Sequence, residues 1–250
     1  MLNNCTENVP RVQRGQLLNR PVIYGISLLG MPLEVFMPTT DIERPLLIMA
    51  AHHGDEPETT ILLSAALRSI PAELLKCAVI LAANPDGLAR GTRGNARGVD
   101  LNRNFPTQNW QSNPILHCWY DDEPKSVELS TGQTPGSEPE TQALLKLVHS
   151  ISPKSVISLH SRLGCVDDPN ATPLAQWLAR AAKLPLVPNI GYPTPGSFGA
   201  WAAENALSLI TFELPDESII TLRRKLSSIF ETLLVQPDEI LKSITTNDYD

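Results

Sequence analysis

Residues 45–67, PLLIMAAHHGDEPETTILLSAAL, contain two apolar runs joined by a short polar segment. The first run is short and aliphatic throughout, as in a strand whose two faces are both buried. The second run places its apolar residues at helical spacing. Between the runs, histidine, aspartate and glutamate fill every position from His52 to Glu56 except Gly54. The stretch predicts a strand, a polar loop and a helix, with a loop that either binds a metal ion or merely begins the helix.

The same alternation of strand and helix patterns continues along most of the chain. We predict strands at 21–28, 45–52, 77–84, 155–160, 184–190 and 207–214, and helices at 58–70, 138–151, 172–184 and 219–235. Ser137 and Glu140 have the spacing of a capping box at the start of the second helix. Strands that alternate with helices predict an α/β fold with three α/β/α layers, in which a mixed, mostly parallel sheet lies between helices.

The segment 88–137 interrupts this pattern. It is rich in Gly, Asn, Pro, Asp and Arg, and no clear helix is visible in it. A loop of this length inside a compact domain is usually functional or disordered, and its varied composition favours a functional loop. With no linker or repeat in the sequence, we expect one catalytic domain over residues 1–250, entered by a short N-terminal segment at about 1–20.

Composition and charge narrow the class of protein. The 250 residues are 42% hydrophobic and 19% charged, with a net charge of −7, which argues against nucleic acid or an anionic membrane as partner. No apolar run approaches the roughly 18 residues of a membrane span. The N-terminal residues do not have the pattern of a signal peptide, and the cysteines form no CxxC pair. We expect a cytoplasmic protein with reduced cysteines. The sequence is compatible with a homodimer but fixes no oligomeric state.

His53 and Glu56 are candidate metal ligands. A histidine and a glutamate three residues apart, between a strand and a helix, can face one ion, and catalytic zinc commonly takes two histidines and one glutamate. The alternative is that Asp55, Glu56 and Glu58 only complement the helix dipole. In an extended chain His52 points to the opposite face from His53, so we expect it to be packed rather than coordinating.

The remaining partners of such a site are expected at other strand ends. Of the other histidines, His117 lies in the irregular segment, His149 lies in a predicted helix, and His160 ends the run SVISLH. Glu213 similarly closes the apolar run LSLITFEL, where a buried carboxylate requires a partner or a function. Ligands of doubly wound sheets gather at the carboxyl ends of strands, which favours His160 as the third ligand, although a core histidine remains the alternative.

Six motifs in order resemble those of the zinc carboxypeptidase family: HGDE (53–56), NPDG (84–87), GVDLNRNFP (98–106), SEPET (137–141), SLHS (158–161) and FELP (212–215). The resemblance covers most of the chain and implies a peptide-bond hydrolase. It implies one zinc ion per chain, bound by His53, Glu56 and His160, and Glu213 as general base and acid. It also implies that Asp100 orients His53, a support that metal-bound histidines generally need.

The same resemblance implies roles in substrate binding. Arg93 corresponds to the arginine that polarises the scissile carbonyl, although Arg97 lies close enough in sequence to compete for this role. Asn102 and Arg103 correspond to the pair that binds the terminal carboxylate of the substrate, for which an arginine can supply two parallel hydrogen bonds. Tyr192 corresponds to a mobile tyrosine over the substrate, or is an ordinary half-buried tyrosine. Trp201 falls at the family's spacing behind Tyr192, and Arg90 and Arg97 are expected on a solvated loop face.

Within the family, the motif combination and the chain length are most similar to members that cleave the γ-D-glutamyl–meso-diaminopimelate bond of murein tripeptide, which implies a small murein peptide as partner. Gly199 falls where the family places the floor of the side-chain pocket. Arg162, Asp167 and Asp168 are candidates to bind the zwitterionic end of diaminopimelate, or belong to a solvated loop.

Three functions are alternatives to cleavage of murein tripeptide. The first is a general cytoplasmic zinc carboxypeptidase, and the second is an aspartoacylase-like amide hydrolase, which the motif series fits less well. The third is a non-catalytic peptide-binding relative, against which the presence of both Glu213 and Arg93 argues. A purely structural protein leaves the ordered motifs unexplained.

Overall fold

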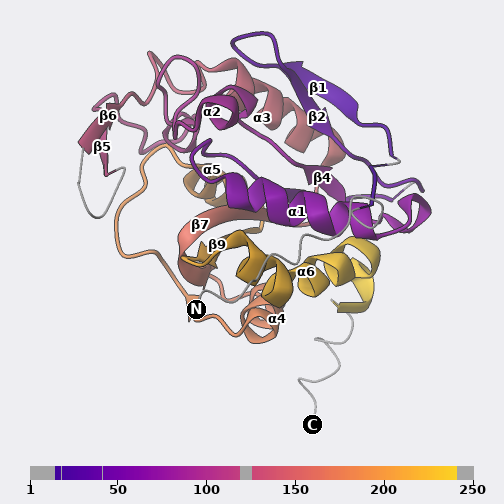
Figure 1. Ribbon diagram of the computed structural model, residues 1–250. Helices are drawn as coiled ribbons and strands as arrows, with labels where there is room; N and C mark the ends of the chain where they lie inside the picture. The colour runs from indigo at the N-terminus through magenta and orange to yellow at the C-terminus, as the bar shows by residue number, and fades with distance from the viewer. Residues whose placement is uncertain (1–14, 18, 41, 119–125, 241–250) are drawn as a thin grey trace, which may run out of the picture.

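The computed structural model describes residues 15–17, 19–40, 42–118 and 126–240. Its central sheet contains β3 (Leu47–Met49), β4 (Ala78–Ile80), β7 (Val156–Asp167), β8 (Leu186–Val187) and β9 (Leu209–Pro215). β3 lies between β4 and β7 and is parallel to both, and β7 carries β9 and β8 as its other neighbours (Figure 1). The predicted α/β class with a mostly parallel sheet is confirmed.

Helices cover both faces of this sheet. They are α1 (Pro57–Ser69), α2 (Pro85–Arg90), α3 (Pro139–Ile151), α4 (Pro173–Ala182), α5 (Phe198–Glu204) and α6 (Ile219–Val235), with short 3-10 turns η2 (Ala72–Leu74) and η3 (Leu101–Arg103). Side chains of a strand alternate between faces, so Ile48 packs against α1, α4 and α6, whereas Leu47 and Met49 pack against α3 and α5. The arrangement is the predicted three-layer α/β/α.

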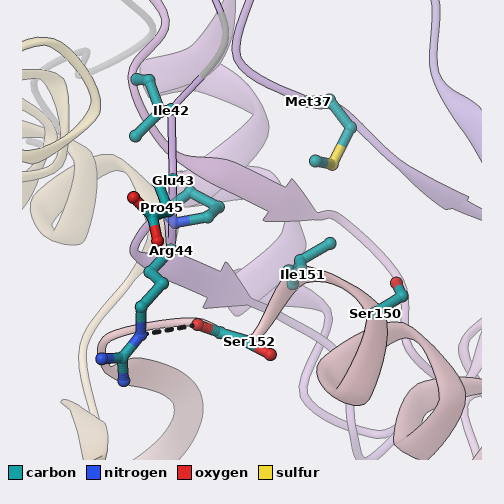
Figure 2. A pocket seen from close by; sticks show the side chains of 8 residues that line it. All are labelled: Met37, Ile42, Glu43, Arg44, Pro45, Ser150, Ile151 and Ser152. Carbon is teal, nitrogen blue, oxygen red and sulfur yellow. Dashed lines mark hydrogen bonds between the residues drawn. The ribbon is translucent and has the colours of Figure 1, made fainter.

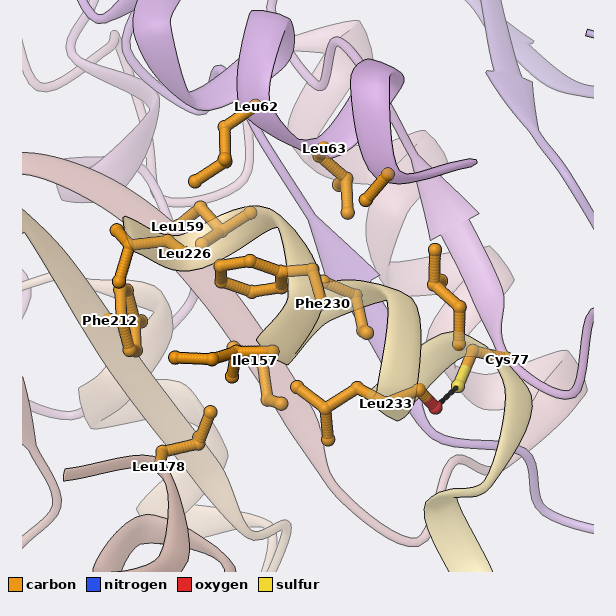
Figure 3. Packing of buried hydrophobic residues seen from close by; sticks show 14 of the residues in the cluster. Leu62, Leu63, Cys77, Ile157, Leu159, Leu178, Phe212, Leu226, Phe230 and Leu233 are labelled. Carbon is orange, nitrogen blue, oxygen red and sulfur yellow. Dashed lines mark hydrogen bonds between the residues drawn. The ribbon is translucent and has the colours of Figure 1, made fainter. Parts of the chain in front are cut away.

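The larger of the two hydrophobic clusters lies under α1, α4 and α6. Figure 3 shows Leu62 and Leu63 of α1 facing Phe230 of α6, with Phe212 of β9 beside them. The rings of Phe212 and Phe230 meet edge to face with centroids 5.4 Å apart, a favoured aromatic geometry. α1 and α6 therefore lie side by side over the sheet (Figure 1).

β7 is longer than the strand predicted at 155–160, because the chain bends and pairs with β9 twice. Val156 to His160 lie opposite Leu209 to Glu213 in order, whereas Cys165 to Asp167 lie opposite Glu213 to Thr211 in reverse order. Register irregularities between residues 162 and 167 mark the bend. His160 and Cys165 are thus both paired with Glu213.

Two predicted strands differ from the structure. The strand predicted at 21–28 is β1 (Val22–Ile26), which pairs antiparallel with β2 (Pro32–Val35) in a separate hairpin instead of joining the central sheet. The hairpin packs on α3 through β1, contacts β4 through β2, and leaves several aliphatic side chains exposed. The strand predicted at 184–190 is reduced to the two residues of β8.

The segment expected to be irregular contains more structure than predicted. Besides η3 it contains the antiparallel hairpin of β5 (Ile115–Cys118) and β6 (Ser126–Leu129). The capping box predicted for α3 is wrong: Glu138 is the N-cap and makes no side-chain cap. Ser137 Oγ instead donates to Glu138 Oε1, and Glu140 accepts from Leu28 N and Asn95 Nδ2. Long-range partners thus replace the local pair.

In the part of the chain that the structure describes, no helix is both long enough and apolar enough to cross a membrane.

Candidate metal and catalytic site

His53, Glu56 and His160 form one buried cluster beyond the carboxyl end of β3 and beside the end of the first arm of β7. Their ligand atoms all lie within 4.8 Å of one another. His53 Nδ1 is 2.7 Å from Glu56 Oε1, His160 Nδ1 is 3.2 Å from Glu56 Oε2, and the two Nδ1 atoms are 3.1 Å apart. Four-coordinate zinc with bonds of about 2.0–2.1 Å holds its ligand atoms about 3.3 Å apart, so the three residues have suitable spacing for this metal.

The partners of the two histidines favour metal binding over a hydrogen-bonded cluster. Asp100 Oδ1 faces His53 Nε2 at 3.5 Å, longer than an ordinary hydrogen bond, and Ser158 Oγ lies 3.0 Å from His160 Nε2. When these partners hold the protons on Nε2, both Nδ1 lone pairs face the Glu56 carboxylate. Lone pairs converging in a buried site repel one another, and a cation relieves that repulsion.

The electrostatic field of the cluster is negative. Burial and Arg93 lower the pKa of His53, but Glu56, together with Asp100, outweighs both and raises it to about 9. The pKa of Asp100, which burial alone would raise, is held well below its usual value by Arg93 and His53. Asp100 is fully buried and stays ionised. The site is therefore suited to a positive charge, whether a proton or a metal ion.

Local hydrogen bonds hold the loop that carries His53 and Glu56. Thr59 Oγ1 in the first turn of α1 accepts from Ala51 N at 3.1 Å and donates to the Glu56 carbonyl at 2.7 Å. Ala51 has a positive φ of 47°, so the chain turns sharply where β3 ends. These bonds place both ligands on the same side of the turn.

Glu213 lies beside the cluster, across the β7–β9 pair from His160. It is 6% exposed, and its Oε2 has no hydrogen-bond partner among the described residues. Burial raises the pKa of the Glu213 carboxyl, and the charge of Glu56 adds to the effect. A buried carboxylate with one oxygen unoccupied has the geometry of a group that exchanges protons.

Arg93 and Arg97, the two candidates for polarising the scissile carbonyl, lie in different surroundings. Arg93 Nε donates to Asp100 Oδ2 at 2.9 Å, and its Nη1 lies 3.7 Å from Glu56 Oε1. Arg97 Nη1 instead donates to both oxygens of Glu138, and its side chain is 47% exposed. The structure thus brings Arg93 to the cluster and directs Arg97 away from it.

The predicted carboxylate-binding pair lies on η3, next to the cluster. Phe198 N donates to Asn102 Oδ1 at 2.9 Å, which leaves the Nδ2 amide as the free donor. Arg103 is 6% exposed, and its Nη1 donates to the Asn102 carbonyl at 2.6 Å. Tyr192 is 51% exposed, and partial burial raises the pKa of its hydroxyl, with Arg93 and Glu213 close enough to contribute.

Two curated relatives are similar to this chain over most of its length, and a family model matches about half of it. The zinc carboxypeptidase family matches residues 44–166. Murein peptide amidase A of Escherichia coli K12 is 47% identical over 207 residues, which are 82% of this chain and 86% of the relative. Murein peptide amidase A of Vibrio campbellii is 44% identical over 92% of this chain and 94% of its own.

The chain belongs to the zinc carboxypeptidase family.

A solved structure agrees with this assignment. The crystal structure of murein-tripeptide amidase from Escherichia coli O157 superposes with a TM-score of 0.85 at 45% identity, over 90% of this chain and 95% of that one. This zinc carboxypeptidase is accordingly a peptide-bond hydrolase, as predicted.

Two polar residues of the ligand loop, His52 and Asp55, are not among the clustered ligands of this zinc carboxypeptidase, although the His52 ring stacks on His53 at 5.8 Å. His52 is buried between Phe105 and Phe198, with edge-on rings at 5.7 and 6.2 Å, and burial holds its pKa well below the usual value. Asp55 Oδ2 lies 3.0 Å from His117 Nε2 on β5. Asp55 therefore connects the loop to the β5–β6 hairpin rather than capping α1, and sequence reasoning missed this contact.

The candidates for substrate side-chain recognition are spread over the bend of β7 and the start of α5. Arg162 is exposed on the bend. Asp168 is 2% exposed and accepts from Asn170 N, Thr172 N and Thr172 Oγ1. Both oxygens of Asp168 therefore hold the turn before α4, and a contact of Asp168 with the substrate stays a prediction.

Ser158 is a functional candidate that sequence reasoning missed. It lies two residues before His160 on β7, and side chains two apart in a strand share a face. That spacing was visible in SLHS and could have revealed it. Trp201, by contrast, is 6% exposed and stacks with Phe198 at 5.9 Å, so it packs in the core.

A separate pocket lies at the opposite end of the sheet. Its volume is about 400 Å³, and it is lined by residues that precede β3 and residues that end α3 (Figure 2). Arg44 Nε donates to the Ser152 carbonyl at 3.2 Å at its rim. None of the predicted site residues lines it.

Proposed function

We propose that this zinc carboxypeptidase hydrolyses the γ-D-glutamyl–meso-diaminopimelate bond of the murein tripeptide L-Ala-γ-D-Glu-meso-diaminopimelate, in cytoplasmic recycling of peptidoglycan. The products are diaminopimelate and L-alanyl-D-glutamate. The supporting observation is the 44–47% identity to murein peptide amidase A over most of both chains. The residues gathered around His53, Glu56 and His160 supply the required chemistry.

Zinc is the proposed cofactor, with one ion held by His53, Glu56 and His160. Two histidines and one carboxylate are a common donor set for catalytic zinc, and they leave a coordination position open. When bound, the ion polarises the scissile carbonyl and makes water a nucleophile near neutral pH. Asp100 orients His53, and Ser158 orients His160.

Glu213 is proposed to move the proton. Its unoccupied Oε2 accepts a proton from the attacking water and then delivers it to the nitrogen of the departing diaminopimelate. Burial raises the pKa of this carboxyl toward the working pH, which makes both transfers easier.

Arg93, Asn102 and Arg103 are proposed to hold the substrate. Arg93 uses Nε on Asp100, and its Nη nitrogens, of which Nη1 lies 3.7 Å from Glu56 Oε1, donate to the oxygen of the scissile carbonyl, where negative charge develops. The Asn102 amide and the Arg103 guanidinium donate to the terminal carboxylate. Tyr192, which is half-exposed, is proposed to close over the bound peptide.

The test is an assay of the zinc-loaded protein on murein tripeptide and on peptides with ordinary α-linked C-terminal Phe, Leu or Lys. We expect kcat/KM to be highest for the tripeptide, and product analysis to give free diaminopimelate. Glu213→Gln serves as the inactive control. A preference for the plain peptides would replace the proposal with a general zinc carboxypeptidase.

A further inference from the structure

Asp167 lies on the same face of the sheet as Glu213, the proposed catalytic base. The returning arm of β7 places Cys165 opposite Glu213 and Asp167 opposite Thr211. Paired residues of neighbouring strands project their side chains to the same face, and so do residues two apart in one strand. Glu213 and Asp167 therefore belong to one face of the sheet, about 7 Å apart along the strand direction.

That face is the one covered by α5. Leu209, two residues before Thr211, packs with Phe198, Trp201 and Ala202 of α5. The opposite face carries Ile210, Phe212 and Val166, which pack with α4 and α6. By alternation, Thr211 and Asp167 lie on the α5 side, between the helix and Glu213.

The start of α5 has open space at Gly199. A Cβ added at Gly199 would meet only Ser197 Oγ, at 3.7 Å. The residue before Gly199, Phe198, binds the side chain of Asn102 through its backbone N–H. Under the proposed function the terminal carboxylate is held at Asn102 and the scissile bond lies at Glu213, so we expect the last side chain to lie between α5 and this face.

Asp167 has an oxygen without a partner. Its Oδ1 is shielded from solvent and accepts no hydrogen bond from the described residues. Burial, with the neighbouring charge of Asp168, raises the pKa of the Asp167 carboxyl. Asp168, the adjacent acid, has both oxygens bonded. Of the two, only Asp167 has an oxygen that no described residue contacts by a hydrogen bond.

We infer that Asp167 is a specificity-determining residue that binds the ammonium group at the far end of a C-terminal diamino-acid side chain. An ammonium donor satisfies the unpartnered carboxylate oxygen and its charge, which an aliphatic side chain cannot do. The inference rests on the proposed function for the identity of that residue as meso-diaminopimelate. It goes beyond that function in assigning the discriminating group.

The experiment compares the zinc-loaded wild type with Asp167→Asn. The substrates are the murein tripeptide and the same tripeptide with α-aminopimelate in place of diaminopimelate, which keeps the distal carboxylate and lacks only the distal ammonium. Asp216→Asn removes the same charge from an exposed position just beyond β9 and serves as the matched control.

The wild type is expected to prefer the diaminopimelate substrate by about 10- to 100-fold in kcat/KM, mainly through KM. Asp167→Asn is expected to lose this preference by lowering kcat/KM for diaminopimelate alone, whereas Asp216→Asn keeps it. Equal loss on both substrates, or an unchanged preference in Asp167→Asn, overturns the inference.

A binding measurement separates this inference from the proposed function. Calorimetric titration with free meso-diaminopimelate and with free α-aminopimelate needs no turnover. Tighter binding of diaminopimelate to the wild type, lost in Asp167→Asn, supports the role of Asp167 even if no tripeptide is cleaved. Equal affinities for the two compounds overturn the inference even if the tripeptide is cleaved.

Discussion

At the scale of single residues, the site depends on which atom of each side chain faces its centre. Nδ1 of His53 and of His160 face Glu56, while Nε2 of each ring faces a supporting oxygen from Asp100 or Ser158. If either imidazole ring were flipped, Nδ1 would no longer face Glu56. The supporting oxygens therefore contribute to the cluster although they do not reach its centre.

Glu213→Gln tests the proposed proton transfer. The amide keeps the shape of the side chain but cannot accept the proton, so kcat should fall by about 100- to 10,000-fold. Zinc content, measured by elemental analysis, should stay at one ion per chain because Glu213 is not among the clustered ligands. Turnover close to wild type would show that another group is the base.

His160→Ala tests the third ligand. Loss of a residue that hydrogen-bonds a metal ligand typically weakens metal binding by about 10- to 100-fold. Loss of the ligand itself should weaken metal binding more. Elemental analysis after dialysis should find the variant depleted of zinc. His149→Ala, on the exposed side of α3, is the matched histidine control and should retain zinc. Full zinc occupancy in His160→Ala would reject it as a ligand.

The raised pKa of the Asp167 carboxyl predicts that the free energy of unfolding depends on pH. Burial and Asp168 raise the pKa of its carboxyl in the folded state above the ordinary value. The folded protein thus holds this proton to higher pH than the unfolded chain, and ionisation of Asp167 destabilises the fold as pH rises. Asp167→Asn removes that effect. The free energy of unfolding of the variant relative to wild type should therefore increase as the pH rises above the ordinary pKa of aspartate, about 3.9.

Urea denaturation at several pH values measures this difference. Asp216→Asn, at an exposed position, is the matched control and should show no such trend. A relative stability of Asp167→Asn that is constant or falls with pH would contradict the burial of the charge.

At the scale of elements, strand ends and a close backbone contact bring the residues together. Strand β3 and the first arm of β7 are parallel and reach the same edge of the sheet, so His53 and His160 meet although they are 107 positions apart. The His53–Glu56 loop packs against α2, where Gly54 touches the backbone of Gly87 and Leu88 without room for a Cβ. The strand pattern predicted the first feature, but nothing local to Gly54 indicated the second.

Gly54→Ala should disturb that contact. The added methyl collides with the backbone of α2, which cannot give way as a flexible side chain does. We expect a destabilisation of about 1–3 kcal/mol, the usual range for overpacking, together with weaker zinc binding. Thermal unfolding and elemental analysis measure the two effects. Gly199→Ala, which has open space, is the control and should unfold at the wild-type temperature or above.

The start of α3 differs from the capping box that its local sequence predicts. Ser137 and Glu140 have capping-box spacing, yet Glu140 binds Leu28 N and Asn95, and Ser137 binds Glu138. Glu138 and Glu140 are 0% and 2% exposed. Buried carboxylates need strong partners, and the loop residue Asn95 supplies one to both. Tertiary hydrogen bonds thus override the local cap.

At the scale of the whole molecule, metal binding and folding should be coupled. The cluster joins segments that are more than a hundred residues apart, so it exists only in the folded chain. Ligand binding to the native state alone stabilises it by about 2.7 kcal/mol when the free ligand is about 100-fold above Kd. For a chain of this size each kcal/mol shifts Tm by about 2–4 °C.

Removal of zinc with a chelator should therefore lower Tm by roughly 5–10 °C, and added zinc should restore it. Scanning calorimetry of the metal-free and zinc-loaded protein measures the shift. His160→Ala should show a much smaller shift than wild type. An unchanged Tm after verified removal of zinc would contradict metal binding at this buried cluster.

The sequence by itself determined the class of fold and the candidates for the chemistry. Aliphatic runs alternating with helical patterns are local consequences of burial, and polar residues such as His53, His160 and Glu213 at their ends are visible without a structure. Only the tertiary structure decided which residues meet. It directed Arg93 to Asp100 and Arg97 to Glu138, folded the end of β7 back along β9, and left Asp167 with an unpartnered oxygen. These outcomes depend on strand register and long-range hydrogen bonds. The energy of such contacts comes from residues far apart in the chain, so no local pattern encodes them.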